Sequence, residues 1–229
     1  SLMVDERGLT LDEEEVKRLK KEIQQRSKEA RTSQVISAQD ITSDVVTVFT
    51  GFDATETDGR ILEIHDQDGA CLAIVDRCPF YAEKGGQVSD SGLIVAGADE
   101  IEVLNIYSVG EAMALHLAEA PASFDGSPLA ITMRVDPARR VAIESHHTAT
   151  HLLHWALHEV VSPDIAQQGS YVGPDRLRFD FNSKALTEEQ IAGLEAAVNQ
   201  KVIENTPVST QEIPHKDIQG REDIMQFFG

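Results

Sequence analysis

Cysteine is scarce in this chain, which contains only Cys71 and Cys78 among its 229 residues. Two cysteines do not make the dense disulfide framework of a small secreted domain, and their spacing does not form a Cys-x-x-Cys motif. We therefore expect buried free thiols in a reducing compartment, which favours a cytoplasmic location.

Long apolar runs are also absent. No stretch approaches the roughly 18 apolar residues that span a membrane, and no signal peptide opens the sequence. Hydrophobic residues make up 41% of the chain, as in a globular protein, and 229 residues can hold one large domain or two small ones. We expect no membrane partner.

Basic residues are outnumbered, since 20 Lys and Arg face 39 Asp and Glu, for a net charge of -19. Charges balance in residues 1–33, so the excess lies in residues 34–229. This argues against strong non-specific binding of nucleic acid. Local recognition stays open, because six cations near the motifs below form either a basic mouth or ordinary surface charge: Lys84, Arg134, Arg139, Arg140, Arg176 and Arg178.

The first two of three expected segments differ sharply in pattern. Residues 1–38 are expected to form a charged linker helix, centred on 11–31, with acids at its start and bases at its end. Residues 39–135 hold short β-branched runs separated by turn residues, which predicts a small β-barrel-like subdomain. The runs are 45–49, 61–64, 71–75, 92–95, 101–104 and 129–135, with turns at Asp58-Gly59, Asp68-Gly69 and Gly97-Ala98-Asp99.

The third segment, residues 136–229, alternates helix and strand signals. Asp136 as N-cap and Pro137 as first residue predict a helix to about residue 161. A strand is predicted at 177–181, a helix with a Thr187–Gln190 capping box to about residue 205, and a strand at 208–213. The predicted fold class is α+β: a barrel-like subdomain followed by an α+β core whose His-bearing helix packs on an antiparallel sheet.

That helix carries five of the eight histidines. His147, His151, His154 and His158 are spaced four, three and four residues apart, which places them in one stripe. Imidazoles at i and i+4 bind one divalent metal in zinc proteins, whereas isolated helix histidines are packed or solvated. Spacing alone does not select the pair. Thr148 stands where zinc proteases have glutamate, so that class is disfavoured.

Two long motifs carry a resemblance. They are Pro-Phe-Tyr-Ala-Glu-Lys-Gly-Gly-Gln-Val-Ser-Asp-Ser-Gly at 79–92, and His-Thr-Ala-Thr-His-Leu-Leu-His at 147–154 followed by Gln-x-Gly-Ser at 167–170 and Arg-Leu-Arg-Phe-Asp-Phe at 176–181. From about residue 40 onward the chain resembles the editing domain of alanyl-tRNA synthetases, a relative of stand-alone alanyl-tRNA editing proteins and of the threonyl-tRNA synthetase editing domain.

The resemblance implies a parent enzyme that is an ATP-dependent alanine–tRNA ligase. The matching part would hydrolyse the ester of mischarged Ser-tRNA(Ala) or Gly-tRNA(Ala), with alanine tRNA as partner. No ATP-binding motif is visible, so ATP would serve only the absent aminoacylation domain. The oligomeric state is left open.

The resemblance also implies a zinc site with His147 and His151 as two ligands. The Cys-x-x-x-His segment that completes it in the family is absent here. We therefore expect a fragment truncated before that segment, with half a zinc site and impaired deacylase activity.

Other site residues follow from the same likeness. It implies that Thr150 and Gln167 are catalytic, with a helix-surface threonine and a plain loop glutamine as the alternatives. It also implies a substrate-binding set made of Gly85, Gly86, Gln87, Gly169 and Ser170. The alternative for the first three of these residues is a simple hairpin turn.

Two other functions compete. A stand-alone trans-editing hydrolase is disfavoured by the missing Cys-x-x-x-His segment. A catalytically silent tRNA-binding module explains the incomplete metal site, but it does not explain the intact Gln-x-Gly-Ser motif.

Overall fold

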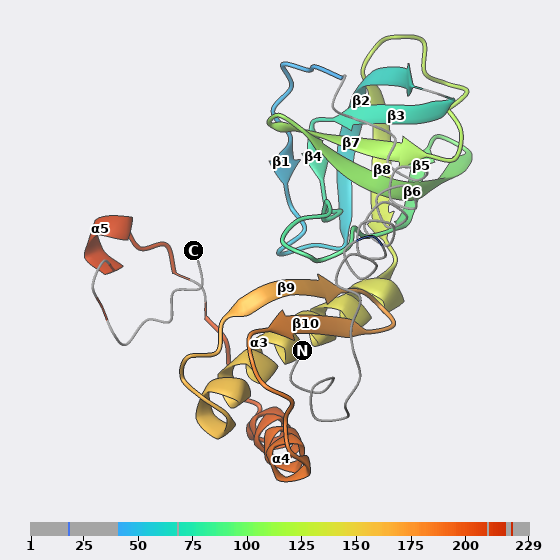
Figure 1. The fold of residues 1–229 in the computed structure, drawn as a ribbon. Helices are drawn as coiled ribbons and strands as arrows, with labels where there is room; N and C mark the ends of the chain where they lie inside the picture. The colour runs from blue at the N-terminus through green and yellow to red at the C-terminus, as the bar shows by residue number, and fades with distance from the viewer. Residues whose placement is uncertain (1–17, 19–40, 68, 210, 219–220, 222–229) are drawn as a thin grey trace.

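The computed structural model describes residue 18 and residues 41–67, 69–209, 211–218 and 221 (Figure 1). The charged helix expected over 11–31 lies outside the described residues, apart from Arg18. In the described part, no helix is both long and apolar enough to cross a membrane.

A closed antiparallel barrel forms the first half of the described chain (Figure 1). Its strand order is β2-β3-β7-β6-β5-β8. The strands are β2 (Glu56–Gln67), β3 (Ala70–Val75), β5 (Gly92–Ala96), β6 (Asp99–Val109), β7 (Ala112–Leu117) and β8 (Leu129–Val135). Two short strands, β1 (Val48–Phe49) and β4 (Arg77–Cys78), pair in parallel in a separate sheet.

The barrel interior is filled by the alternate residues of each strand. In β6, Ile101 and Val103 are buried, whereas Glu100 and Glu102 are exposed. This period of two follows from the pleat, which points successive side chains to opposite faces. Cys78 is also buried there, and burial raises the pKa of its thiol to about 12, so it stays a protonated, apolar group.

Two predictions in this region are wrong. The turn expected at Asp58-Gly59 lies inside β2, where Gly59 pairs with Ile131 of β8. A Cβ on Gly59 would lie 2.8 Å from Met133 Cε, so this glycine allows a close approach of strands rather than a turn. Strand β7 was not predicted, because its alanines have low strand propensity and its pairing with β3 and β6 decides its conformation.

The chain leaves the barrel through Asp136 and enters α3 (Pro137–Val160) as predicted. Asp136 Oδ1 accepts hydrogen bonds from the backbone N–H groups of Ala138 at 2.9 Å and Arg139 at 3.1 Å. These bonds satisfy two of the orphan donors at the start of the helix. The helix therefore begins at a defined residue, which fixes the position of every histidine on it.

A hairpin and a second helix pack around α3 (Figure 1). Strands β9 (Gln167–Val172) and β10 (Leu177–Phe181) pair in antiparallel fashion. Helix α4 (Glu188–Glu204) starts with the predicted capping box. A second core holds them together, built from buried residues of α3, β10, α4 and the loop before β9: Ala156, Leu157, Ile165, Phe179 and Leu194. The α+β class with a barrel is confirmed.

The strand predicted at 208–213 is wrong. The described residues of this stretch have no regular structure, and Val208 is 91% exposed. A strand needs a neighbour to satisfy its backbone, and none of the described strands pairs with this segment. The short helix α5 (His215–Ile218) follows.

Candidate functional site

A segment between β4 and β5 reaches from the barrel toward α3. We call residues 79–90 the arm. Its two ends are joined, since Tyr81 N donates to Asp90 Oδ2 at 2.7 Å and Asp90 N donates to the carbonyl of Tyr81 at 3.1 Å. The arm is therefore a closed loop with a defined base and a defined tip.

The tip of the arm is the two-residue turn Gly85-Gly86. Lys84 and Gln87 exchange backbone hydrogen bonds at 3.2 and 3.1 Å across it. Both glycines have positive φ, 63° and 86°, as a type I′ hairpin turn requires. The turn packs on β9, because Val172 N donates to the carbonyl of Gly86 at 2.8 Å and Val88 N donates to the carbonyl of Val172 at 3.0 Å.

Gln87 links the arm to the histidine stripe. Its side chain is only 8% exposed, and its Oε1 lies 2.6 Å from Nδ1 of His147. An amide oxygen only accepts, so His147 carries its proton on Nδ1 and presents a lone pair on Nε2. That Nε2 lies 3.1 Å from Nε2 of His151.

The neutral state of His147 is favoured by its surroundings. Burial lowers the pKa of His147, and the neighbouring His151 lowers it further. A buried imidazole resists protonation because the charged form loses its hydration. His147 thus keeps an unprotonated nitrogen directed at His151 near neutral pH.

One pocket of about 470 Å³ collects the predicted site residues. Every one of them lines it except Gly86, which packs against Ser170 beside it. The lining comes from the arm, α3, β9 and β10: Gly85, Gln87, His147, Thr150, His151, His154, Gln167, Gln168, Gly169, Ser170, Val172 and Phe179. None of these described lining residues is a carboxylate, Lys or Arg.

Gln167 and Ser170 lie on strand β9, so the loop reading of Gln167 is wrong. Gln167 Nε2 donates to Ser170 Oγ at 3.1 Å, which orders two polar groups on the pocket wall. On the opposite wall Thr150 is only 8% exposed, and its hydroxyl donates to the carbonyl of His146 at 2.8 Å. The pocket therefore offers fixed neutral polar groups around the histidine pair.

The remaining histidines of α3 have other partners. His146 Nδ1 lies 2.7 Å from the carbonyl of Gly173, and His158 Nε2 lies 2.8 Å from that of Ile165. His154 is 4% exposed and packs on Phe179 with ring centroids 5.0 Å apart. His146 and His158 therefore bond to backbone carbonyls, and His154 packs against β10.

The histidine pair fits a metal ion as two of its ligands. A tetrahedral zinc with Zn–N bonds of about 2.0–2.1 Å holds its nitrogens about 3.3 Å apart, close to the separation of 3.1 Å between the two Nε2 atoms. The bond from Nδ1 to the amide oxygen of Gln87 resembles the outer contacts of metal-bound histidines, in which the second ring nitrogen donates to an oxygen. Within the described residues, no group of three or more His, Cys, Asp or Glu could hold a metal.

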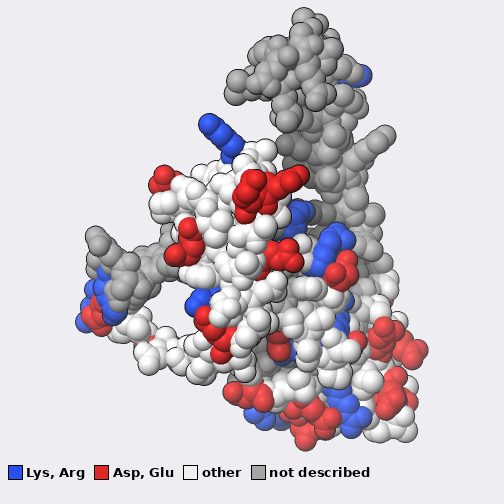
Figure 2. All heavy atoms as spheres, turned by 90° about the horizontal axis from the view of Figure 1, so that it is seen from below, with Lys and Arg blue, Asp and Glu red and all other residues white. Residues whose placement is uncertain are grey.

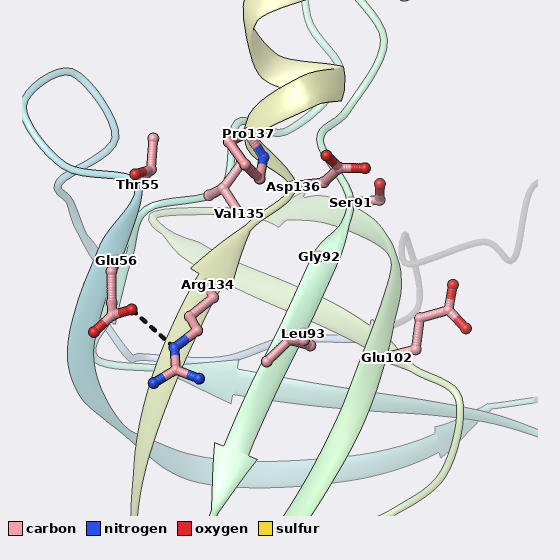
Figure 3. Close-up of a pocket in the computed structure, with 10 residues that line it drawn as sticks. All are labelled: Thr55, Glu56, Ser91, Gly92, Leu93, Glu102, Arg134, Val135, Asp136 and Pro137. Atoms are coloured by element: carbon pink, nitrogen blue, oxygen red, sulfur yellow. Dashed lines mark hydrogen bonds and ion pairs between the residues drawn. The ribbon is translucent and has the colours of Figure 1, made fainter.

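A second hollow of about 600 Å³ lies on the barrel beneath the start of α3 (Figure 3). Three of its charged groups already have partners, since Arg134 pairs with Glu56 at 2.8 Å and Asp136 caps α3. It contains no imidazole. It is larger than the histidine pocket, but it lacks groups that could activate a substrate.

The six cations near the motifs do not form a free cationic patch, because Arg134 and three others are paired with acids. Arg140 pairs with Asp90, Arg176 with Asp175 and Arg178 with Asp180. Figure 2 shows basic groups interspersed with acidic ones on the face seen from below, rather than gathered in one area. Lys84 is exposed beside the turn at the tip of the arm.

Sequence reasoning missed the bond from Gln87 to His147 and the pocket wall formed by Gln168, Val172 and Phe179. Gln87 and His147 are 60 residues apart, so no local spacing could connect them. The alternation of Phe179 with its charged neighbours does mark it as inward-facing, but not what it faces.

Comparison with known proteins identifies the family. Residues 1–139 match the family model described as tRNA synthetases class II (A). This chain belongs to that class II family. Alanine–tRNA ligases from Akkermansia muciniphila and Methylacidiphilum infernorum are 46% and 38% identical to it, each over 100% of the chain and 24% of the ligase. The one from Acetivibrio thermocellus is 37% identical over 92% of the chain and 26% of the ligase.

These matches confirm the resemblance to alanyl-tRNA synthetases. The family model ends at Arg139, in the first turn of α3, whereas the ligases align over the histidine stripe as well. The chain spans about a quarter of the length of the relatives it matches.

Proposed function

We propose that the pocket around His147 and His151 hydrolyses the ester of mischarged Ser-tRNA(Ala) or Gly-tRNA(Ala), as an editing site within an alanine–tRNA ligase that acts in the cytoplasm. The observation that carries this proposal is the convergence of the two Nε2 atoms at 3.1 Å in the same pocket as Gln167, Ser170 and Thr150. The similarity to alanine–tRNA ligases supports an alanine tRNA as the partner in this proposal.

The pocket suits a small polar aminoacyl group. An aminoacyl ester is already activated, so the site has to orient it, position water and stabilise charge at the carbonyl oxygen. Gln167 and Ser170 offer an ordered amide and hydroxyl to the amino group or side chain of the substrate. None of the described lining residues has a charged side chain, so none competes with Gln167 and Ser170 for the ester.

We further propose that His147 and His151 hold zinc when it is present. Zinc supplies Lewis-acid polarisation of a carbonyl and activation of water. The chain's own part is to keep His147 in the Nδ1-protonated tautomer through Gln87, and to keep its Nε2 unprotonated by burial. ATP belongs to aminoacylation by the whole ligase, and none of the described pocket residues forms a phosphate cradle.

The test is the Gln167→Ala substitution in the whole alanine–tRNA ligase proposed to contain this chain. Because it removes a positioned donor, we expect hydrolysis of Ser-tRNA(Ala) to slow about a hundredfold, while the rate of alanine attachment is kept. Gln200→Ala on α4, which removes an exposed amide bonded to Glu204 at 3.4 Å, is the matched control and should change neither rate.

A loss confined to alanine attachment would contradict the proposal. The same holds for a wild-type protein that does not release serine from alanine tRNA above the uncatalysed rate.

A further inference from the structure

The buried polar residues of the described chain all belong to the arm or to α3. They are Gln87, Ser89 and Asp90 of the arm, and Arg140, Thr150 and His154 of α3. Burial of polar groups costs free energy unless they are hydrogen-bonded. Gln87, Asp90 and Arg140 make hydrogen bonds across the contact between the arm and α3, so the geometry of this polar seam is closely specified.

Arg140 forms hydrogen bonds with both ends of the arm. Its guanidinium donates to Asp90 Oδ2 from Nη2 at 2.6 Å and to Asp90 Oδ1 from Nε at 3.1 Å. It also donates to the carbonyls of Pro79 at 2.9 Å and Gly51 at 2.8 Å. With Arg140 6% and Asp90 1% exposed, this pair is shielded from water. A planar guanidinium with five donors can make all these bonds at once, which a lysine cannot.

Arg139 adds a second hold on the arm. Its Nη2 and Nε donate to the carbonyl of Ser89 at 3.0 and 3.3 Å. Ser89 stands two residues after Gln87, so this contact lies between the base of the arm and the residue that touches His147. Both arginines belong to the first turn of α3, whose start is fixed by the Asp136 cap.

The spacing along α3 relates the contacts of Arg139 and Arg140 to the position of His147. Arg140 and His147 are seven residues apart, which puts them on one face of the helix about 10 Å from each other. The arm spans the same interval, with its base at Arg140 and Gln87 at His147. It is thus fixed to α3 at two points.

We infer that Arg139 and Arg140 are positioning residues, which hold the arm along α3 so that Gln87 meets His147 and sets its tautomer. The inference rests on the proposed function for the catalytic meaning of that tautomer, but the contact itself can be tested without it. An ordinary structural ion pair would stabilise the fold and leave the state of His147 unchanged.

The experiment compares Arg140→Lys and Arg139→Gln, each alone and combined with Gln87→Ala. Arg140→Lys keeps the charge beside Asp90 and loses the carbonyl contacts. Arg139 is partly exposed, so Arg139→Gln remains informative if the buried variant folds poorly. Arg60→Gln is the matched control, because it breaks the exposed pair with Asp76 on the barrel, 2.9 Å long.

The first readouts are the tautomer of His147, from long-range proton–nitrogen NMR correlations at pH 7.5, and amide hydrogen exchange. We expect each arginine variant to shift His147 from the pure Nδ1–H form to a mixture. Exchange at Val88 and Val172 should speed up, because their amides bond between the arm and β9 and are exposed when this contact opens, with β3 unchanged. In the Gln87→Ala background the arginine changes should leave the tautomer as Gln87→Ala alone sets it.

The second readout is Ser-tRNA(Ala) hydrolysis by the intact protein. We expect kcat to fall about tenfold in each arginine variant and less than about twofold when Gln87 is already alanine, because residues acting through one contact are not additive. Unchanged tautomer and exchange, or equal kcat losses in both backgrounds, would overturn the inference. If the wild type releases no serine but the tautomer shifts as expected, the positioning role stands and the proposed function alone fails.

Discussion

At the scale of single residues, His147 is defined by what touches each of its nitrogens. Gln87 holds Nδ1, His151 faces Nε2, and burial lowers the pKa of the ring. His158 has the same residue type on the same helix stripe, but its Nε2 lies at a backbone carbonyl. The two histidines therefore differ in ligand capacity although their spacing in the sequence is equivalent.

This difference predicts the effect of two matched substitutions on zinc binding. His147→Gln should weaken zinc binding by the chain at least about tenfold, because it removes a ligand whose nitrogen is already oriented. His158→Gln should leave it unchanged. Competition with a chromophoric chelator at pH 7.5 measures both, and equal affinities for His147→Gln and wild type would disprove the ligand assignment.

At the scale of elements, the arm depends on the glycine turn at its tip. A Cβ on Gly86 would lie 2.6 Å from Ser170 Oγ and 2.7 Å from the backbone oxygen of Ser170. A Cβ on Gly85 would meet nothing within 4 Å. Both residues have positive φ, so alanine is strained at either position by about 1–2 kcal/mol.

Gly85 and Gly86 allow a matched comparison of the stability effect of alanine. Gly86→Ala should lower the free energy of unfolding by at least about 1 kcal/mol more than Gly85→Ala, because it adds a clash with the backbone of β9 to the same φ strain. Urea unfolding measures the difference. Equal losses in the two variants would mean that the arm does not press on β9 in solution.

Elements with local signals were predictable from the sequence. Asp136 with Pro137 and Thr187 with Gln190 specify their helix starts through bonds within a few residues, and both helices begin as predicted. Strands β7 and β9 were missed because their alanines, glutamines and glycine have weak strand preference, and their partners decide. The site residues were found through motifs, but the contact of Gln87 with His147 depends on the folding of the arm.

At the scale of the whole molecule, the described residues form two main apolar cores that are joined by the polar seam of arm and α3, and a third, smaller cluster around Ile74 belongs to the barrel strands. The barrel core includes Leu115, and the second core includes Leu157; both side chains are fully buried. Apolar packing gives most of the stability within each core, whereas the seam between them consists of directional bonds.

The two-core arrangement predicts regional effects of cavity mutations. Leu157→Ala should cost about 2–5 kcal/mol and speed hydrogen exchange mainly in α4 and β10. Leu115→Ala should cost a similar amount and act mainly on β3 and β7. Exchange read peptide by peptide distinguishes these patterns, and a uniform increase across the chain in either variant would show a single cooperative unit instead.

The arm has one further consequence for how this protein can be divided. The sequence suggests a boundary at residues 135 and 136, where strands give way to helix. The arm crosses that boundary in space, since it extends from the barrel and its Gln87 contacts the ring of His147. A piece starting at α3 would keep both histidines but lose the acceptor that selects the tautomer of one of them. The unit that can be inherited or transplanted with its chemistry intact is therefore the barrel together with α3 and the hairpin of β9 and β10.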